Sequence, residues 1–172
     1  IKVCPMAKWS GLKRFYKETS TCDGVDGAYL VALDERIVKT PAGFNLGVPS
    51  RSLAEALAKE WQIQGEIIDP SSMPLCKLAA TAIDRVRTKR DEVIGITLKI
   101  AETDLLCYRA IEPPDLVEHQ NIEWQPELDW AKEVLGVDLA VTSGILPIIQ
   151  PESSLLTLQK ILGELDEYKF CL

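Results

Sequence analysis

The sequence predicts an α+β fold, in which a small β-rich N-terminal domain is followed by a helical domain. Short alternating segments separated by turn residues fill the first 49 residues, as expected of antiparallel strands. After Pro49 the apolar residues recur at helical spacing over several long segments. With 47% hydrophobic and 26% charged residues, the 172-residue chain has an ordinary globular composition. We therefore expect domains at residues 8–49 and 50–172.

The N-terminal domain is predicted to be a meander of short strands. Residues 14–18 (RFYKE) are a candidate first strand. Residues 27–34 (GAYLVALD) alternate in the pattern of a half-buried strand. The remaining predicted elements are turns at 23–27, 34–36 and 41–43, and strands at 37–40 and 44–48.

The first two helices are marked by their boundary residues. Ser50 is a suitable N-cap, and Leu57 and Trp61 follow on one face of the predicted helix. Gly65 is expected to end this helix as a C-terminal glycine. A second helix is expected from Pro74, because proline suits the first helical turn.

Three further helices complete the predicted helical domain. Residues 91–101 are apolar on nearly all sides, which is typical of a central helix. Residues 113–135 are helical, and Pro126 is expected to kink or split this helix. Residues 137–141 alternate like a short strand, and Pro151 begins the last helix.

Charge and hydropathy argue against two classes of partner. The chain has 19 basic and 26 acidic residues, a net charge of −7, whereas nucleic-acid binding requires a basic excess. No apolar run approaches the roughly 20 residues of a membrane span. The sequence therefore predicts neither nucleic-acid binding nor membrane insertion. The first residues also lack a secretory apolar core and a transit-peptide pattern.

The sequence contains none of the common catalytic signatures. It has no P-loop, GxGxxG, GxSxG or HExxH motif, and its one histidine, His119, is expected at the surface. The five cysteines form no CxxC pair, so we expect free thiols in a reducing compartment. Asp84 and Asp104 lie between apolar runs and are candidates for carboxylate chemistry. The simpler expectation is that they cap helices or pair with Arg85 and Arg109.

One stretch concentrates the negative charge. Residues 112–138 contain eight acidic residues and a single base, Lys132, so they account for the net charge of the whole chain. Trp124 and Trp130 are interleaved with these acids. Either this is a solvated face whose tryptophans turn into the core, or it is a docking face for a basic or exposed apolar partner.

Several segments stand together in one order. They are RFYKE (14–18), GAYLVALDERIVKTPAG (27–43), VPSRSLAEALAKEWQIQGEIIDPSSMPL (48–75), AATAIDRV (79–86), TDLLCYRA (103–110) and EWQPELDWAKEVLGVDL (123–139). This ordered set resembles a family of mitochondrial and alphaproteobacterial ATP synthase assembly chaperones, which handle the α subunit of the catalytic head. The resemblance covers residues 8–168.

The resemblance implies a non-enzymatic chaperone that binds the free α subunit and shields its subunit interface until hexamer assembly. It implies a bacterial cytoplasmic or mitochondrial matrix location, and neither a nucleotide nor a metal cofactor. The candidate residues that match the family's motifs, for partner binding or as scaffold, are Glu60, Trp61, Asp104, Tyr108, Arg109, Trp124 and Trp130. Trp61 lies on the apolar face of its helix and is expected to be a core residue.

The chain departs from the family pattern after Tyr168, where members continue with two apolar helices and an acidic tail. We therefore expect a C-terminally shortened helical domain whose uncovered apolar face would favour self-association. Residues before Met6 match nothing in the family, which makes Met6 a candidate natural start. Two other functions stay open: an acidic adaptor that binds a basic partner through residues 112–138, and a small carboxylate-dependent enzyme.

Overall fold

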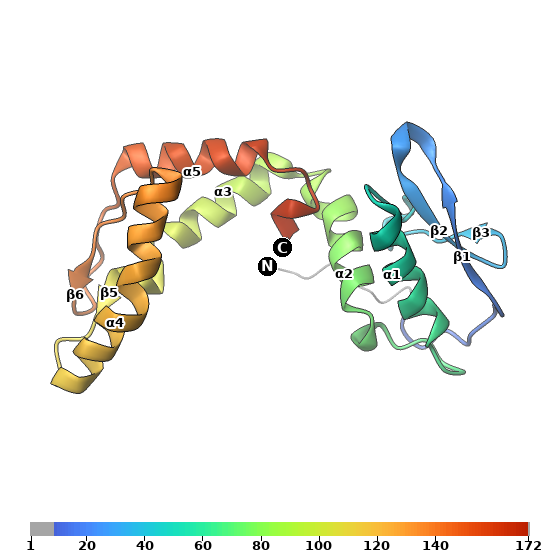
Figure 1. The fold of residues 1–172 in the computed structure, drawn as a ribbon, viewed down its shortest axis with the longest axis horizontal. Coiled ribbons are helices and arrows are strands. Elements are labelled where there is room, and N and C mark those ends of the chain that lie inside the picture. The colour runs from blue at the N-terminus through green and yellow to red at the C-terminus, as the bar shows by residue number, and fades with distance from the viewer. Residues whose placement is uncertain (1–8, 172) are drawn as a thin grey trace. The chain divides into compact units, whose positions relative to one another are not determined.

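The computed structural model describes residues 9–171, which form two compact units with an α+β fold (Figure 1). The first unit contains the described residues up to Arg90 together with residues 166–171, and the second contains residues 91–165. The change from strands to helices near residues 49 and 50 therefore falls inside the first unit. The division into domains at that point stays a prediction.

An antiparallel sheet of four strands lies on one side of the first unit. The central strand β2 pairs with β1 along one edge and with the short β3 and β4 along the other. The strands are β1 (Thr19–Asp23), β2 (Tyr29–Leu33), β3 (Arg36–Ile37) and β4 (Gly47–Val48). A two-residue turn with positive φ at Asp34 and Glu35 joins β2 to β3, as in tight hairpins. The predicted strand within residues 27–34 and the turn after it are confirmed.

The predicted strand at residues 14–18 is wrong. Its two ends bond to other backbone, Arg14 to Glu66 and Glu18 to Asp34, whereas the backbone between them bonds to side chains. The Asp34 carboxylate accepts hydrogen bonds from the N–H groups of Lys17 and Glu18, at distances of 2.9–3.1 Å. The Arg14 guanidinium donates to the carbonyl groups of Gln62 and Gln64 beside it. The first strand begins only at the next residue.

Helix α1 (Arg51–Gln62) packs against the sheet, and α2 (Pro74–Thr81) packs against α1. Their predicted starts are confirmed: the Ser50 hydroxyl accepts from the N–H of Leu53, and Pro74 occupies the first turn of α2. Gly65 does not end α1. The helix already ends at Gln62, and the Gln64 side chain donates to the Glu60 carbonyl near its end.

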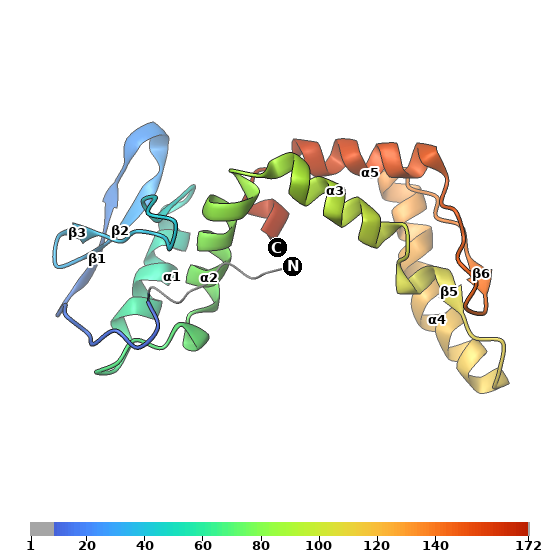
Figure 2. The same ribbon diagram turned by 180° about the vertical axis from the view of Figure 1, so that it is seen from behind.

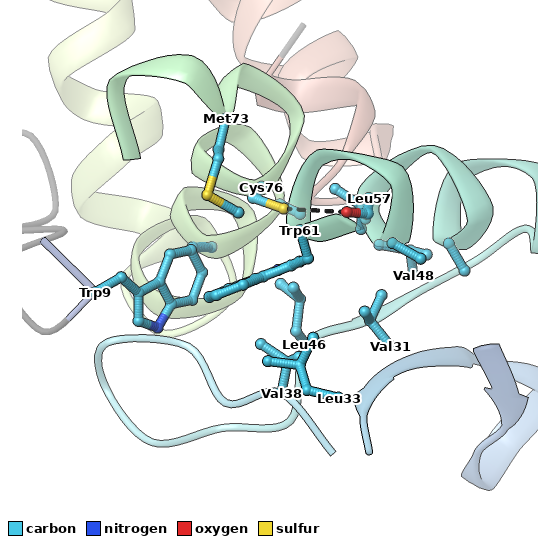
Figure 3. Packing of buried hydrophobic residues seen from close by; sticks show 14 of the residues in the cluster. Trp9, Val31, Leu33, Val38, Leu46, Val48, Leu57, Trp61, Met73 and Cys76 are labelled. Atoms are coloured by element: carbon cyan, nitrogen blue, oxygen red, sulfur yellow. Dashed lines mark hydrogen bonds between the residues drawn. The ribbon is translucent and has the colours of Figure 1, made fainter. Parts of the chain in front are cut away.

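The core of the first unit lies between α1, α2 and the sheet. Trp61 is 2% exposed and packs edge-on against Trp9, with ring centroids 5.1 Å apart, and against Tyr16 at 6.0 Å. Figure 3 shows Trp61 among the aliphatic side chains of the sheet and the two helices. The Tyr16 hydroxyl also donates to the Trp61 carbonyl at 2.7 Å. The expectation that Trp61 is a core residue is confirmed.

Residues 166–171 return to the first unit. The Tyr168 hydroxyl donates to the carbonyl of Gly47 at 2.5 Å, and Arg87 pairs with Glu167 at 2.6 Å. The described part of the unit also contains one-turn elements, namely the π-helical segment Ala82–Val86 directly after α2 and 3-10 turns at Val25–Gly27, Pro70–Ser72 and Lys169–Cys171.

The second unit consists of three helices and a two-stranded ladder (Figure 2). These elements are α3 (Arg90–Ala101), β5 (Tyr108–Arg109), α4 (Pro114–Trp130), β6 (Thr142–Ser143) and α5 (Glu152–Glu164). Strands β5 and β6 are parallel, with Tyr108 opposite Thr142. The two last predicted helices are confirmed.

Three predictions for the second unit are wrong in part. Helix α3 is not buried on all sides, because only Ile94 among its residues is buried and Ile100 is 55% exposed. Pro126 does not split its helix, which runs through it to Trp130 and continues as a π-helical turn. The short strand lies at Thr142–Ser143 and not at 137–141, because only there does the backbone meet β5.

Across the described residues, no helix combines the length and the apolar character that a membrane crossing requires.

Candidate functional site

The segment 104–110 connects α4 to the rest of the second unit. Asp104 accepts from the N–H of Leu106 at 2.9 Å, so its carboxylate caps a 3-10 turn, as expected of a cap. The Arg109 side chain is only 5% exposed and donates to the carbonyl of Gln120 in α4. Its guanidinium carbon lies 5.4 Å from the centre of the Trp124 ring, within the range of a cation–π contact. Arg109 thereby fixes the face of α4 that carries Trp124.

The same segment also positions the chain that follows α4. The carbonyl of Arg109 accepts from the N–H of Gly144 at 2.8 Å, next to the β5–β6 ladder. The hydroxyl of Tyr108 accepts from the N–H of Ile148 at 3.4 Å. Both contacts hold residues 144–149 beside β5. We call residues 144–149 the apolar loop.

Hydrogen bonds from polar side chains hold the C-terminal end of the apolar loop in place. The buried Gln150 side chain bonds to both the N–H and the carbonyl of Ala140, at 2.8 and 3.1 Å. The buried Ser154 hydroxyl bonds to the N–H and the carbonyl of Asp138 in the same way. The loop is therefore anchored at its start by β5 and at its end by these two side chains.

The apolar loop presents large hydrophobic side chains to solvent. Ile145 and Ile149 are each 95% exposed, and Leu146 is 76% exposed. At the start of the loop, a Cβ added to Gly144 would lie 3.4 Å from the side chain of Ile111, which is itself exposed. Fully exposed isoleucines on an anchored loop indicate a surface that binds another apolar surface.

Ile111 also lines a shallow hollow on α4. The hollow is bordered by Ile111, Pro114, Val117, Glu118, Asn121 and Ile122. It has a volume of about 530 Å³ and a mostly apolar wall. The apolar loop and this hollow meet at Ile111, and together they form what we call the apolar surface of the second unit.

The acidic stretch lies beside the apolar surface. All eight acidic side chains of residues 112–138 are exposed. Lys132 pairs with Asp138 at 2.8 Å, and this hydrogen-bonded carboxylate raises the pKa of Lys132. Trp124 is half-buried and Trp130 is 52% exposed. Trp130 therefore does not turn into the core, as it would on a purely solvated face with buried tryptophans. Exposure of Trp130 favours the docking interpretation.

Glu60 and Trp61 belong to the core of the first unit. The Glu60 carboxylate, 8% exposed, accepts from the N–H groups of Leu75 and Cys76 at the start of α2. Asp84 also holds backbone in this unit, since it accepts from the Thr40 hydroxyl at 2.5 Å and from the N–H of Ala42 at 2.9 Å. These carboxylates serve as hydrogen-bond acceptors within the fold. Sequence reasoning did not find this role for Glu60.

The groups that usually carry catalysis are dispersed. His119 is exposed on α4, as expected. Burial raises the pKa of the Cys107 thiol, and the nearby Asp104 carboxylate adds to this effect. Within residues 9–171, no three His, Cys, Asp or Glu side chains are grouped so that they could hold a metal ion. Cys22, Cys76, Cys107 and Cys171 are free thiols, and Cys4 lies outside the described residues.

The seven residues singled out from the sequence thus fall into two groups. Glu60 and Trp61 stabilise the first unit. In the second unit Asp104, Tyr108 and Arg109 share the segment 104–110, and Trp124 contacts Arg109, whereas Trp130 is exposed at the end of α4. The apolar loop was missed. Its signal was the run GILPII at 144–149, which has six uncharged residues and neither helical nor strand periodicity.

Comparisons with known proteins identify relatives of this chain. The model of the family described as ATP12 chaperone protein matches residues 13–132. The protein named atp12, mitochondrial, from Schizosaccharomyces pombe is 28% identical over 158 residues, which is 87% of this chain and 54% of the relative. This chain therefore spans about half the length of that relative.

The fold of this chain is also similar to that of solved structures. The crystal structure of Atp12 from Paracoccus denitrificans has a TM-score of 0.86 and 37% identity, over 92% of this chain and 68% of that one. The structure of the Atu1473 protein from Agrobacterium tumefaciens has a TM-score of 0.85 and 36% identity. The match covers 92% of this chain and 60% of that one.

Proposed function

The chain belongs to the ATP12 chaperone family, and from this premise we propose that it is an assembly chaperone of the ATP synthase that binds the free α subunit of the catalytic head. The observation that carries the proposal is the family match over residues 13–132. The proposed location is the mitochondrial matrix or the bacterial cytoplasm, in line with the name of the fission-yeast relative and the bacterial sources of the similar structures.

The apolar surface of the second unit supports this proposal physically. A ring subunit that has not yet assembled exposes a large interface, and exposed apolar interfaces aggregate. A protein that covers such an interface needs apolar groups held ready at its own surface. Ile145 and Ile149 meet this requirement because they are almost fully exposed on a loop with two anchored ends.

The anchoring of the loop bears on affinity. Ordering a flexible segment during binding costs conformational entropy, and a segment that is already held loses less. The bonds from Tyr108, Arg109 and Gln150 hold the loop beside the β5–β6 ladder before any partner arrives. We infer that Tyr108 and Arg109 contribute to client binding indirectly, by positioning this loop.

The acidic stretch next to the apolar surface supplies a polar rim. Interfaces commonly combine an apolar centre with a charged margin that guides association. In the proposed complex, the exposed acids of residues 112–138 contribute mainly to the rate and orientation of binding. If this stretch were instead the principal contact, as in the adaptor alternative, binding would weaken steeply with salt.

Co-elution with purified ATP synthase α subunit on size exclusion, at low and at moderate salt, tests the proposal. We expect a complex that persists at moderate salt and disperses when β subunit is added, because β competes for the shielded interface. A complex that forms only at low salt would support the adaptor alternative. The absence of a complex with a folded chain would overturn the proposal.

A further inference from the structure

Strand β1 is an edge strand whose outer side is unpaired among the described residues. It bonds to β2 on one side, and no other described strand pairs with it. We propose that this edge takes up an extended strand of the client protein by antiparallel or parallel addition to the sheet. The inference rests on the proposed function and adds a second contact, in the first unit, of a different chemical kind.

The hydrogen bonds around β2 establish which groups of β1 point outward. Thr21 lies opposite Val31. The N–H of Val31 donates to Leu46 and its carbonyl accepts from Val38, so both backbone groups of Val31 point away from β1. Thr21 therefore belongs to a pair that exchanges no hydrogen bonds, and its own N–H and carbonyl face the outer edge.

The ends of the β1–β2 ladder agree with this assignment. The N–H of Asp34 donates to the carbonyl of Glu18, and the N–H of Gly24 donates to the carbonyl of Ala28. Bonded pairs alternate with non-bonded pairs in an antiparallel ladder. The even-numbered residues of β1 therefore bond to β2, whereas Thr19, Thr21 and Asp23 direct their backbone groups outward.

This edge lacks the features that normally prevent strand addition. Natural edge strands are usually protected by lysine, proline, a bulge or a covering segment. Residues 19–22 of β1 read Thr-Ser-Thr-Cys and contain neither a charge nor a proline. The first charge is Asp23, at the end of the strand, and it pairs with Arg51 at 3.2 Å.

A groove beside the edge offers space for the added strand. It is lined by Thr19, Ser20 and Thr21 of β1 and by Glu55, Ala58, Lys59 and Gln62 of α1, and its volume is about 320 Å³. Its helix side carries both an acidic and a basic side chain. The occupant that fits is an extended segment bound mainly through its backbone, with small or polar side chains toward α1.

Residue-resolved hydrogen–deuterium exchange of the full chain, free and bound to purified α subunit, tests the proposal. In the free chain the amides of Thr19 and Thr21 should exchange rapidly, and those of Ser20 and Cys22 slowly. In the complex Thr19 and Thr21 should exchange at least about tenfold more slowly. This alternating pattern distinguishes strand addition from general shielding, which would slow neighbouring exposed amides alike.

Two variants at one position provide a second test. Thr21→Pro removes an outward N–H without removing a bond to β2, whereas Thr21→Val keeps this N–H. If both variants melt like the wild type, we expect Thr21→Pro to bind the α subunit about tenfold more weakly and Thr21→Val to bind normally.

Each failure has a distinct meaning. A complex that forms without slower exchange at Thr19 and Thr21 would overturn the strand addition and leave the proposed function intact. Slow exchange of these amides in the free chain would overturn it as well, since the edge would already be covered, for example by a second copy. If the wild-type chain does not bind the α subunit, the proposed function and this inference both fail.

Discussion

Glu60 of α1 caps the start of α2 by accepting a hydrogen bond from the N–H of Cys76 at 2.8 Å. Its second carboxylate oxygen accepts from the N–H of Leu75 at 2.9 Å. Pro74, which lacks an N–H, occupies the first position of α2, so one acidic side chain satisfies the next two backbone donors. The contact joins the end of one helix to the start of the next.

Glu60→Ala should destabilise the first unit by about 1–3 kcal/mol, because a buried and a partly buried N–H group lose their acceptor. Urea denaturation of the full chain measures this change. Glu55→Ala is the matched control, since Glu55 is exposed on the same helix and its loss should change stability by less than about 0.5 kcal/mol. Equal stability of the two variants would show that the cap contributes nothing.

Trp61→Arg should cost several kcal/mol and reduce solubility, because it places an unpaired charge among Trp9, Tyr16 and the aliphatic core. Trp61→Phe keeps an apolar ring and should be milder. Thermal unfolding and soluble yield measure both effects. An Arg variant with the melting temperature and solubility of the wild type would refute this account of Trp61.

Asp34 should make the first unit acid-sensitive. Hydrogen bonds from the N–H groups of Glu18 and Lys17 lower the pKa of its carboxyl group below the ordinary 3.8. A lowered pKa in the folded state stabilises the fold above pH 3.8, and this contribution is lost as the pH falls through the folded-state pKa. Asp34→Asn should therefore be less stable than the wild type near neutral pH, and the difference should shrink in acid.

Denaturant titrations across this range measure the effect of Asp34. Asn tolerates the positive φ of 44° at this position, so the variant tests mainly the charge. Asp26→Asn is the control, because Asp26 is an exposed aspartate that also has positive φ. A stability difference for Asp34→Asn that does not change with pH would contradict the prediction.

The thiols should differ in reactivity. Burial raises the pKa of Cys76, and the charge of Glu60 raises it further, whereas Cys22 is exposed on β1. Alkylation at mildly alkaline pH, followed by mass spectrometry, should modify Cys22 in the folded chain. Cys76 and the buried Cys107 should react only after denaturation. Modification of Cys76 at the rate of Cys22 under native conditions would contradict the buried packing of α2.

Local chemistry made much of the fold predictable. Ser50 and Pro74 marked two helix starts because caps act within one turn of the chain. The alternation predicted β2 as a half-buried strand, but Val31, Ala32 and Leu33 are all buried, so the strand is covered on both faces there. Predictions that depended on distant partners were less successful. The backbone near Lys17 is held by Asp34, a contact between residues far apart in the sequence, and so it forms no strand.

The candidate site was predictable only in part. The acidic stretch and Trp130 were recognised from composition, but the sequence left open whether the tryptophans turn into the core, and the exposure of Trp130 became apparent only in the fold. The exposure of Ile145 and Ile149 could not be derived from sequence, because an uncharged run without periodicity is equally compatible with burial. Its exposure results from the anchors at Arg109 and Gln150, which only the fold brings together.

The central claim is that the apolar surface of the second unit binds the ATP synthase α subunit. Titration calorimetry of the α subunit with the wild-type chain, an Ile145→Ser/Ile149→Ser variant and a Val25→Ser control tests it most directly. Val25 is 81% exposed in the first unit, outside this surface. Burying one isoleucine contributes roughly 1.5–3 kcal/mol, so the double variant should bind at least about tenfold more weakly, with unchanged melting temperature. Equal affinity of all three proteins would contradict the claim.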